Sequence, residues 1–342
     1  MVQSLLPALE QCDSIRIEEI FLPDNGKLSN YARLSPGPAP IQYRRRLPNQ
    51  LSRVLECTLL AGQFADSTPL LVLGDVPLRC ESPQIVFIQS AHICSGIRSP
   101  TWQTAIKHRL SRLLFRLNAS HVLAYVVQTD VMRVQLEDSY PAVKGKVVVI
   151  SQPPPSWVLE SGLRRSGRLA TAGEKLDLFY PAVSYAHKNH ALLSNIPAAQ
   201  AENWPVERLA LTIPKAVHPN PEVPWIECVG TLTPPGMLKA YGAADGLIFL
   251  SEAESYGLPL VEAIHIGLPI IAPDLPYART LCGAEAIYFK PASIESLQQA
   301  VEELASRLSE HWWPDWSEAR ARLPGEWQAV AKAFLHAMTD RS

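Results

Sequence analysis

Residues 246–290 read GLIFLSEAESYGLPLVEAIHIGLPIIAPDLPYARTLCGAEAIYFK. An apolar strand ends at Leu250 and is followed by the polar loop 251–257. A helix should then begin near Pro259, because proline suits the first helical turn, and end at Gly267, a suitable C-cap. A second apolar strand follows at 269–272. This strand–loop–helix–strand unit predicts a parallel sheet with helical crossovers.

The same unit forms a site for an anion. The loop and the first helical turn present backbone N–H groups and the positive end of the helix dipole, which suit a phosphate or diphosphate. We expect Tyr256, Gly257 and Leu258 to supply these donors, with Gly257 allowing close approach of the backbone. The flanking carboxylates, Glu254 and Glu262, are suited to accept hydrogen bonds from sugar hydroxyls. The segment therefore predicts a nucleotide-sugar site.

Short apolar runs alternate with helix-sized segments along the rest of the chain. Runs of this kind, separated by crossovers, predict an α/β protein with two domains and parallel sheets. Proline and small residues mark the boundary, which we place so that the first domain is 1–170 and the second begins at 171. The apolar runs are 70–73, 85–88, 122–127 and 147–150 in the first domain, and 176–180, 209–213, 226–229, 247–250, 270–272 and 286–289 in the second.

The composition excludes several classes of protein. Hydrophobic residues make up 47%, charged residues 19%, and the formal net charge is −2, which excludes a disordered chain and gives no global attraction to nucleic acid. No apolar run approaches the ~18 residues that span a bilayer, and the N-terminus lacks the pattern of a secretory signal. Six single cysteines without a C-x-x-C pair argue against a zinc ribbon or a disulfide framework. We expect a soluble, cytoplasmic protein.

The central segment resembles the signature of the large retaining glycosyltransferase family four, also described as glycosyl transferases group 1. That signature has two glutamates with seven residues between them around a Gly-Phe-Gly-Leu-Pro-like turn, and here it runs Glu254-Ser255-Tyr256-Gly257-Leu258-Pro259-Leu260-Val261-Glu262. The resemblance is specific over 176–305 and weaker over 83–150. It implies a GT-B fold, in which two Rossmann-like domains face a cleft. The second domain, 171–325, would hold the donor, and the final helix, 326–342, would cross back to the first.

The resemblance also implies an activity. It predicts a glycosyltransferase that moves a sugar from a GDP- or UDP-sugar, with retention, to a glycan or lipid-linked acceptor. The implied setting is surface-polysaccharide or lipopolysaccharide assembly on the inner face of the plasma membrane. The base, the sugar, the acceptor and the linkage are not fixed by the sequence, because pocket shape decides them.

Individual roles follow from the matching positions. Glu262 would bind the ribose hydroxyls, Glu254 the transferred sugar, and the backbone from Ser255 to Leu258 the diphosphate. Lys188 and Asn189 lie in LFYPAVSYAHKNH (178–190), which resembles the first loop of the family's donor domain, where a lysine meets the diphosphate. A lysine is a compact charge suited to a leaving diphosphate. Gly230 completes the predicted donor site.

On the acceptor side, 85–92 reads IVFIQSAH and resembles a strand whose end faces the reacting sugar. Gln89 and His92 would lie in the cleft there, and His92 is our third catalytic candidate beside Glu254 and Lys188. An ordinary loop histidine is an equally weighted alternative for His92.

Two departures from the family pattern keep an alternative open. The family places an arginine about five residues before the lysine, where this chain has Ala182 and Val183, and it opens with a strand and a glycine-rich loop, whereas the first glycine here is Gly26. The alternative is a non-catalytic GT-B relative that binds a nucleotide sugar or a partner glycosyltransferase. An oxidoreductase is disfavoured because no G-x-G-x-x-G follows an early strand.

Two further features concern metals and membranes. No His, Asp or Glu cluster has ligand spacing and no D-x-D pair is present, so we expect a donor site without a metal or other cofactor. Residues 101–117 read TWQTAIKHRLSRLLFRL, a basic amphipathic helix suited to an anionic membrane surface. The alternative is a helix whose apolar face packs on the core. Trp312, Trp313 and Trp316 are expected to pack against the final helices.

Overall fold

Apolar runs form parallel sheets in both halves of the chain, as the sequence predicts, although the strand at 70–72 is only half-buried. The computed structural model describes residues 2–13, 16–24, 28, 31, 41–43, 49–64, 68–94, 101–167 and 175–339. Gly26 and the boundary predicted at 170/171 lie outside these residues. The chain divides into two compact units, Met1–Pro153 with Pro324–Ser342 (unit 1) and Pro154–Leu323 (unit 2).

Unit 2 contains the central segment of the sequence. Its elements are α5 (Ser156–Leu159), β7 (Leu176–Tyr180), β8 (Val206–Leu211), β9 (Ile226–Cys228), α6 (Pro234–Ala243), β10 (Gly246–Ile248), α7 (Leu258–Ile266), β11 (Ile270–Pro273), α8 (Pro276–Cys282), β12 (Ile287–Phe289), α9 (Ile294–Ser309) and α10 (Ser317–Ala321). The described strands form a six-stranded sheet in the order β12-β11-β10-β7-β8-β9, with every pair parallel. One apolar core cluster covers this sheet.

The crossover from β7 to β8 differs from our expectation. We predicted helix-sized crossovers throughout, but here the described chain forms short 3₁₀ segments: η5 (Ala186–Lys188), η6 (His190–Asn195) and η7 (Ala198–Asn203). Asn189 interrupts the first two in a left-handed conformation (φ 54°), and Pro197 precedes the third. A left-handed residue and a proline both prevent continuous α-helix, so the crossover stays segmented.

Unit 1 has a smaller sheet. Its elements are α1 (Val2–Glu10), β1 (Phe21–Pro23), β2 (Ile41–Tyr43), α2 (Asn49–Cys57), η1 (Ala61–Phe64), β3 (Leu70–Val72), β4 (Gln84–Phe87), η2 (Ala91–Ile93), α3 (Trp102–Asn118), β5 (Val122–Val127), α4 (Asp130–Ser139), β6 (Val147–Val149) and α11 (Trp327–Thr339). Its described strands form a parallel sheet β3-β4-β5-β6 and a separate parallel pair β1-β2.

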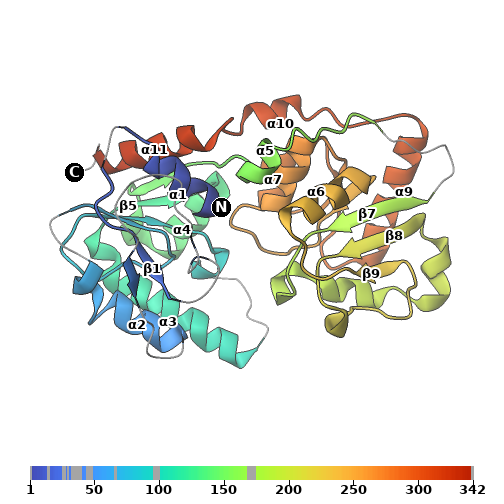
Figure 1. Cartoon of the computed structure of the whole chain (residues 1–342). Coiled ribbons are helices and arrows are strands. Elements are labelled where there is room, and N and C mark those ends of the chain that lie inside the picture. The colour runs from blue at the N-terminus through green and yellow to red at the C-terminus, as the bar shows by residue number, and fades with distance from the viewer. Residues whose placement is uncertain are drawn as a thin grey trace. The chain divides into compact units, whose positions relative to one another are not determined.

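The last helix belongs to the first unit. In α11 the side chain of Phe334 is fully buried and meets Phe87 of β4 edge to face, with ring centroids 5.2 Å apart. The red α11 also lies beside the blue α1 in Figure 1, and the two helices are in contact. The chain therefore returns to unit 1 after Leu323.

Unit 2 begins upstream of the boundary that we predicted at 170/171. Val158 of α5 is fully buried in the core of unit 2. The amide of Arg165 donates to the Ile266 carbonyl at 2.7 Å, and its guanidinium donates to the carbonyls of Gly242 and Ala244 at 2.5 and 2.9 Å. These bonds fasten 154–167 to unit 2, although the sequence there has little periodicity.

Helix α3 packs only partly on the core, so it matches neither the membrane-surface alternative nor the core-packed alternative completely. Thr101 caps it through a reciprocal capping box with Thr104, and Leu114 and Phe115 are buried. Ile106, Leu113 and Leu117, however, are 53%, 52% and 62% exposed. The core-packed alternative is thus wrong for three of its apolar positions. Within the described residues, no helix combines the length and apolarity that crossing a bilayer requires.

Candidate functional site

The strand order of unit 2 reverses at one point in the sheet, and the loops on either side of that point lead in opposite directions. From β7 the chain moves outward through β8 to β9, whereas β10 lies on the other side of β7 and leads outward to β11 and β12. The order therefore reverses between β7 and β10. In open parallel sheets, ligands bind in the crevice outside the carboxyl ends of the strands at this switch point. Lys188 follows β7 and Glu254 follows β10, so the topology brings both loops to this point.

The two loops are fastened to each other. The His187 carbonyl accepts hydrogen bonds from the Glu252 amide at 2.8 Å and from the Ser251 hydroxyl at 3.1 Å. The Tyr180 hydroxyl donates to the Lys188 carbonyl at 2.6 Å, and the Tyr277 hydroxyl donates to the Ser251 carbonyl at 2.5 Å. Backbone of both loops is thus held by hydrogen bonds within the protein itself, which is the arrangement that preorganised sites need.

Lys188 and Glu254 meet across this junction. The Lys188 Nζ atom donates to Glu254 Oε1 at 2.5 Å, and the two side chains are only 14% and 11% exposed. The ammonium also lies 5.7 Å from the centre of the Phe249 ring. Two charges this well buried require one another, because a lone buried charge is costly. Of the three donors on the ammonium, the carboxylate uses one.

The N-terminus of α7 provides the anion donors. Gly257 is its N-cap, with φ of +90°, and Gly267 is its C-cap, with φ of +97°, so both predicted ends of the helix are confirmed. Among the described residues, the amides of Gly257 and Leu258 have no acceptor. Unpaired amides at the positive end of a helix dipole attract anions. The side chain of Tyr256 is buried in the core, whereas Ser255 is half-buried in the loop.

Asn189 and His190 continue the loop beyond Lys188. Asparagine adopts the left-handed conformation found at Asn189 more readily than most residues do. The ring of His190 lies 4.9 Å from that of Tyr180 and is 8% exposed. Burial, and secondarily the Lys188 charge, lower the pKa of His190 to about 4, so its imidazole is neutral at pH 7 and leaves Lys188 as the charge of this loop.

Glu262 lies deeper than its predicted role requires. It is 6% exposed, and the hydroxyl of Tyr241 on α6 donates to its Oε2 atom at 2.6 Å. Burial raises the pKa of Glu262 to about 7, against a smaller lowering by the Tyr241 hydrogen bond. Tyr241 therefore already occupies one oxygen of the carboxyl group that we expect to bind ribose.

Gly230 follows β9, further along the sheet. Its φ is +73°, its amide donates to the Ile213 carbonyl at 3.1 Å, and a Cβ atom at this position would have no neighbour within 4 Å. The backbone here is open to an approaching group, although the loop is two strands away from β7 in the sheet.

His92 lies in unit 1. Its ring stacks on that of His108 of α3, with centroids 4.4 Å apart and planes inclined by 14°. Burial, and then the neighbouring His92, Lys107 and Arg112, lower the pKa of His108 to about 4. The Gln89 side chain donates to the Leu73 carbonyl at 3.2 Å. Both predicted acceptor-side residues thus have contacts within their own unit.

Three tyrosines of the site were not predicted from the sequence. Tyr180 and Tyr277 orient the two loops, and Tyr241 orients Glu262. No sequence signal identified them. Tyr241 and Tyr277 bond residues 21 and 26 positions away, and Tyr180, eight residues before Lys188, reaches its partner only once the loop is folded. Within the part of the chain that the structure describes, no three His, Cys, Asp or Glu side chains form a group that could hold a metal ion.

The fold and the position of this site define the class of architecture: the chain has the α/β GT-B fold of glycosyltransferases. Among solved structures, WaaG, described as a glycosyltransferase involved in lipopolysaccharide biosynthesis, is similar with a TM-score of 0.60 and 14% identity, over 87% of this chain and 86% of WaaG. A Rickettsia africae glycosyltransferase has a TM-score of 0.54 and 12% identity, over 94% and 85% of the two chains. TarM of S. aureus has a TM-score of 0.57 and 13% identity, over 82% and 57%.

Sequence comparison gives a shorter match. The serotype-specific mannosyltransferase WbdA of Escherichia coli is 28% identical over 102 residues, which are 30% of this chain and 12% of WbdA. The chain thus matches about an eighth of the length of this relative. No protein-family model matches the chain.

Proposed function

We propose that this protein is a glycosyltransferase that takes a sugar from a nucleotide diphosphate sugar bound at the switch point of unit 2. The observation that carries the proposal is the Lys188–Glu254 pair beside the unpaired amides of Gly257 and Leu258. Cationic and amide donors suit a diphosphate, and the adjacent carboxylate suits sugar hydroxyls. A nucleotide diphosphate sugar would contact the ammonium, the amides and the carboxylate at the same time.

The chemical step follows from where charge develops. When the bond between the anomeric carbon and the diphosphate breaks, negative charge grows on the leaving diphosphate. The Lys188 ammonium and the two amides would stabilise it, which is the largest electrostatic demand of the reaction. In our proposal these groups take the place of a metal ion, and Glu254 orients the sugar ring. Retention at the anomeric carbon rests on the resemblance to family four.

Glu262 and Tyr241 would act together on the nucleoside. We propose that the ribose hydroxyls meet the carboxyl oxygen that Tyr241 does not occupy, while Gly230 and Asn189 shape the surrounding backbone. His92 remains a proposed acceptor-side residue, and the acceptor is proposed to be a glycan or a lipid-linked glycan. The names of the similar proteins support this setting, since WbdA is a mannosyltransferase and WaaG is involved in lipopolysaccharide biosynthesis. The solved complex of TarM with UDP supports a nucleotide-linked donor.

We also propose that α3 lies on an anionic membrane at the inner face of the plasma membrane. Trp102, at 71% exposure, shares one helix face with the exposed Ile106, Leu113 and Leu117, because they are spaced by four, seven and four residues. Arg109 and Arg116 lie along one border of this stripe, and both are exposed. Apolar side chains bordered by basic ones are typical of interfacial helices.

Turnover by the purified full chain tests the catalytic proposal. UDP- and GDP-sugars are incubated with the protein, and release of the nucleotide diphosphate is measured with and without glycan acceptors. Glu254→Gln should lower the rate on the order of 10²-fold or more, as expected for one preorganised group. Glu252→Gln, an exposed neighbour whose loop contact is made by its backbone amide, is the matched control and should keep the rate. Binding of nucleotide without turnover of any donor would favour the non-catalytic relative instead.

A further inference from the structure

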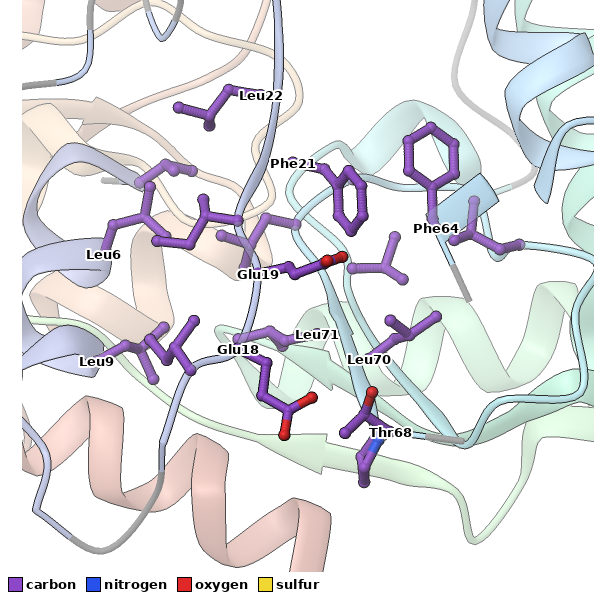
Figure 2. Close-up of a pocket in the computed structure, with 18 of the residues that line it drawn as sticks. Leu6, Leu9, Glu18, Glu19, Phe21, Leu22, Phe64, Thr68, Leu70 and Leu71 are labelled. Carbon is purple, nitrogen blue, oxygen red and sulfur yellow. The ribbon is translucent and has the colours of Figure 1, made fainter. Parts of the chain in front are cut away.

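Unit 1 contains a cavity of about 810 Å³ that the proposed function does not use. Figure 2 shows side chains that line it: Leu6 and Leu9 from α1, Phe21 and Leu22 from β1, and Leu70 and Leu71 from β3. Leu335 of α11 also lines it. The walls are mainly apolar, and the cavity lies entirely among residues of unit 1.

The cavity runs along the edges of two strands. Every residue of 16–23 and every residue of 68–74 lines it. Within these stretches, β1 (Phe21–Pro23) and β3 (Leu70–Val72) are strands, whose side chains alternate between two faces. A cavity that contacts each successive residue of such a strand follows its edge, where the backbone N–H and C=O groups point. Among the described strands, β1 pairs only with β2 and β3 only with β4. The other edge of β1 and the other edge of β3 therefore have no partner among the described strands, and we place both edges on the cavity side.

This combination selects one kind of occupant. An alkyl chain would fill the apolar walls but could not bond the backbone groups of the two edges, and buried backbone groups without partners are unfavourable. An extended polypeptide satisfies both requirements, since a strand offers donors and acceptors on each side. The apolar Leu70, Leu71 and Val72 are all half-exposed, as they would be in an edge strand that lacks its neighbour.

We propose that the cavity binds an extended segment of a partner protein, which adds as a strand between β1 and β3 and joins the two sheets of unit 1. Glu18 and Glu19 are exposed and line the cavity, and Figure 2 labels both beside Phe21 and Leu71. Arg16 and Arg53 also line the cavity and are exposed, so its charged rim carries both signs. A partner segment that complements this site is apolar along the strand and places a basic residue against Glu18 and Glu19. The surface is independent of the donor site, which lies in unit 2.

Hydrogen exchange with a synthetic probe tests this inference. The probe is an amidated peptide of alternating valine, isoleucine and threonine, with lysines at one end, added to the full chain. The amide of Leu70 already donates to the Pro83 carbonyl on the β4 side at 2.8 Å, so the next amide along, that of Leu71, is the one on the cavity edge of β3. We expect the amide of Leu71, and amides within 20–22, to exchange at least about tenfold more slowly with the probe present. The control peptide has proline at alternate positions, which removes the donors needed for a ladder, and should give no protection.

Two outcomes would overturn the inference. One is equal protection by the proline peptide or by decanoate, which would show that apolar filling alone suffices. The other is absence of protection at both strands with a soluble probe. Leu71→Glu places a charge in the cavity wall and should abolish probe binding, whereas Val134→Glu, on the exposed face of α4, should not. Turnover of a nucleotide sugar does not depend on these outcomes, so this inference and the proposed function fail separately.

Discussion

At the scale of single residues, the site depends on one buried ion pair, Lys188–Glu254. Lys188 and Glu254 are 66 positions apart in the chain, yet their side chains meet at 2.5 Å. From the sequence we predicted a donor-binding role for each, with no indication that the two side chains bind one another. A bound diphosphate would compete with Glu254 for the Lys188 ammonium, so donor binding should rearrange this pair.

Glu262 gives a prediction about pH. Its pKa of about 7 in the folded protein lies above the ordinary value of 4.5, so the folded state holds the proton more tightly than the unfolded state does. The resulting stabilisation is fully present below pH 4.5 and is lost as the pH rises through 7. We expect the free energy of unfolding of the wild type to fall between pH 5 and pH 8 by about 2–3 kcal/mol more than that of Glu262→Gln.

Denaturant unfolding at both pH values measures this difference. Glutamine keeps the size of the side chain and cannot ionise, so other titrating groups contribute equally to both proteins. Parallel pH profiles of wild type and variant would show that folding does not raise the pKa of Glu262, which would contradict this prediction.

At the scale of elements, α7 shows which features a sequence can predict. Pro259 and Gly267 correctly indicated where the helix begins and ends, because proline and left-handed glycine have local conformational requirements. The strands were predictable for a similar reason, since continuous aliphatic runs suit a sheet that is buried on both faces. The segmented β7–β8 crossover was not predicted, because the left-handed conformation of Asn189 is not fixed by its residue type. The roles of Tyr241 and Tyr277 were not predicted either, because their partners lie 21 and 26 residues away in the chain.

The C-terminal end of α7 gives the prediction at this scale. A Cβ atom on Gly267 would lie 2.3 Å from the carbonyl oxygen of Arg165, in addition to the strain of φ +97°. Gly267→Ala should therefore lower the free energy of unfolding by about 3 kcal/mol or more. Gly162→Ala is the control: φ is +65° there, but the space is open, so only about 1–2 kcal/mol should be lost.

Thermal or denaturant unfolding of the two variants separates steric overlap from backbone strain. Equal losses in Gly267→Ala and Gly162→Ala would mean that 154–167 does not pack against α7 as described. A larger loss of unfolding free energy in Gly267→Ala would support the assignment of 154–167 to unit 2. The sequence of this segment is too weakly periodic to show that assignment.

At the scale of the whole molecule, our proposals assign a donor site to unit 2 and a membrane-binding helix, α3, to unit 1. We expect the protein to bind vesicles that contain anionic lipid and to release them as salt rises, because Arg109 and Arg116 act through screened charges. The double variant Ile106→Ser and Leu117→Ser should bind markedly less in a vesicle sedimentation assay.

Val134→Ser is the matched control, since Val134 is 49% exposed on α4 of the same unit. Equal binding by the double variant and the wild type would place the contact elsewhere on the molecule. If salt did not change vesicle binding, the charges of Arg109 and Arg116 would not contribute to it.

The decisive measurement is amide hydrogen exchange of the full chain with UDP and with GDP at saturating concentration. We expect the nucleotide of the true donor to slow exchange of Gly257 and Leu258 and of the loop at Lys188 and Asn189. We expect Lys188→Ala to weaken this protection. Nucleotide binding that leaves Gly257 and Leu258 unprotected, or no binding of either nucleotide at millimolar concentration, would contradict a diphosphate site at the start of α7.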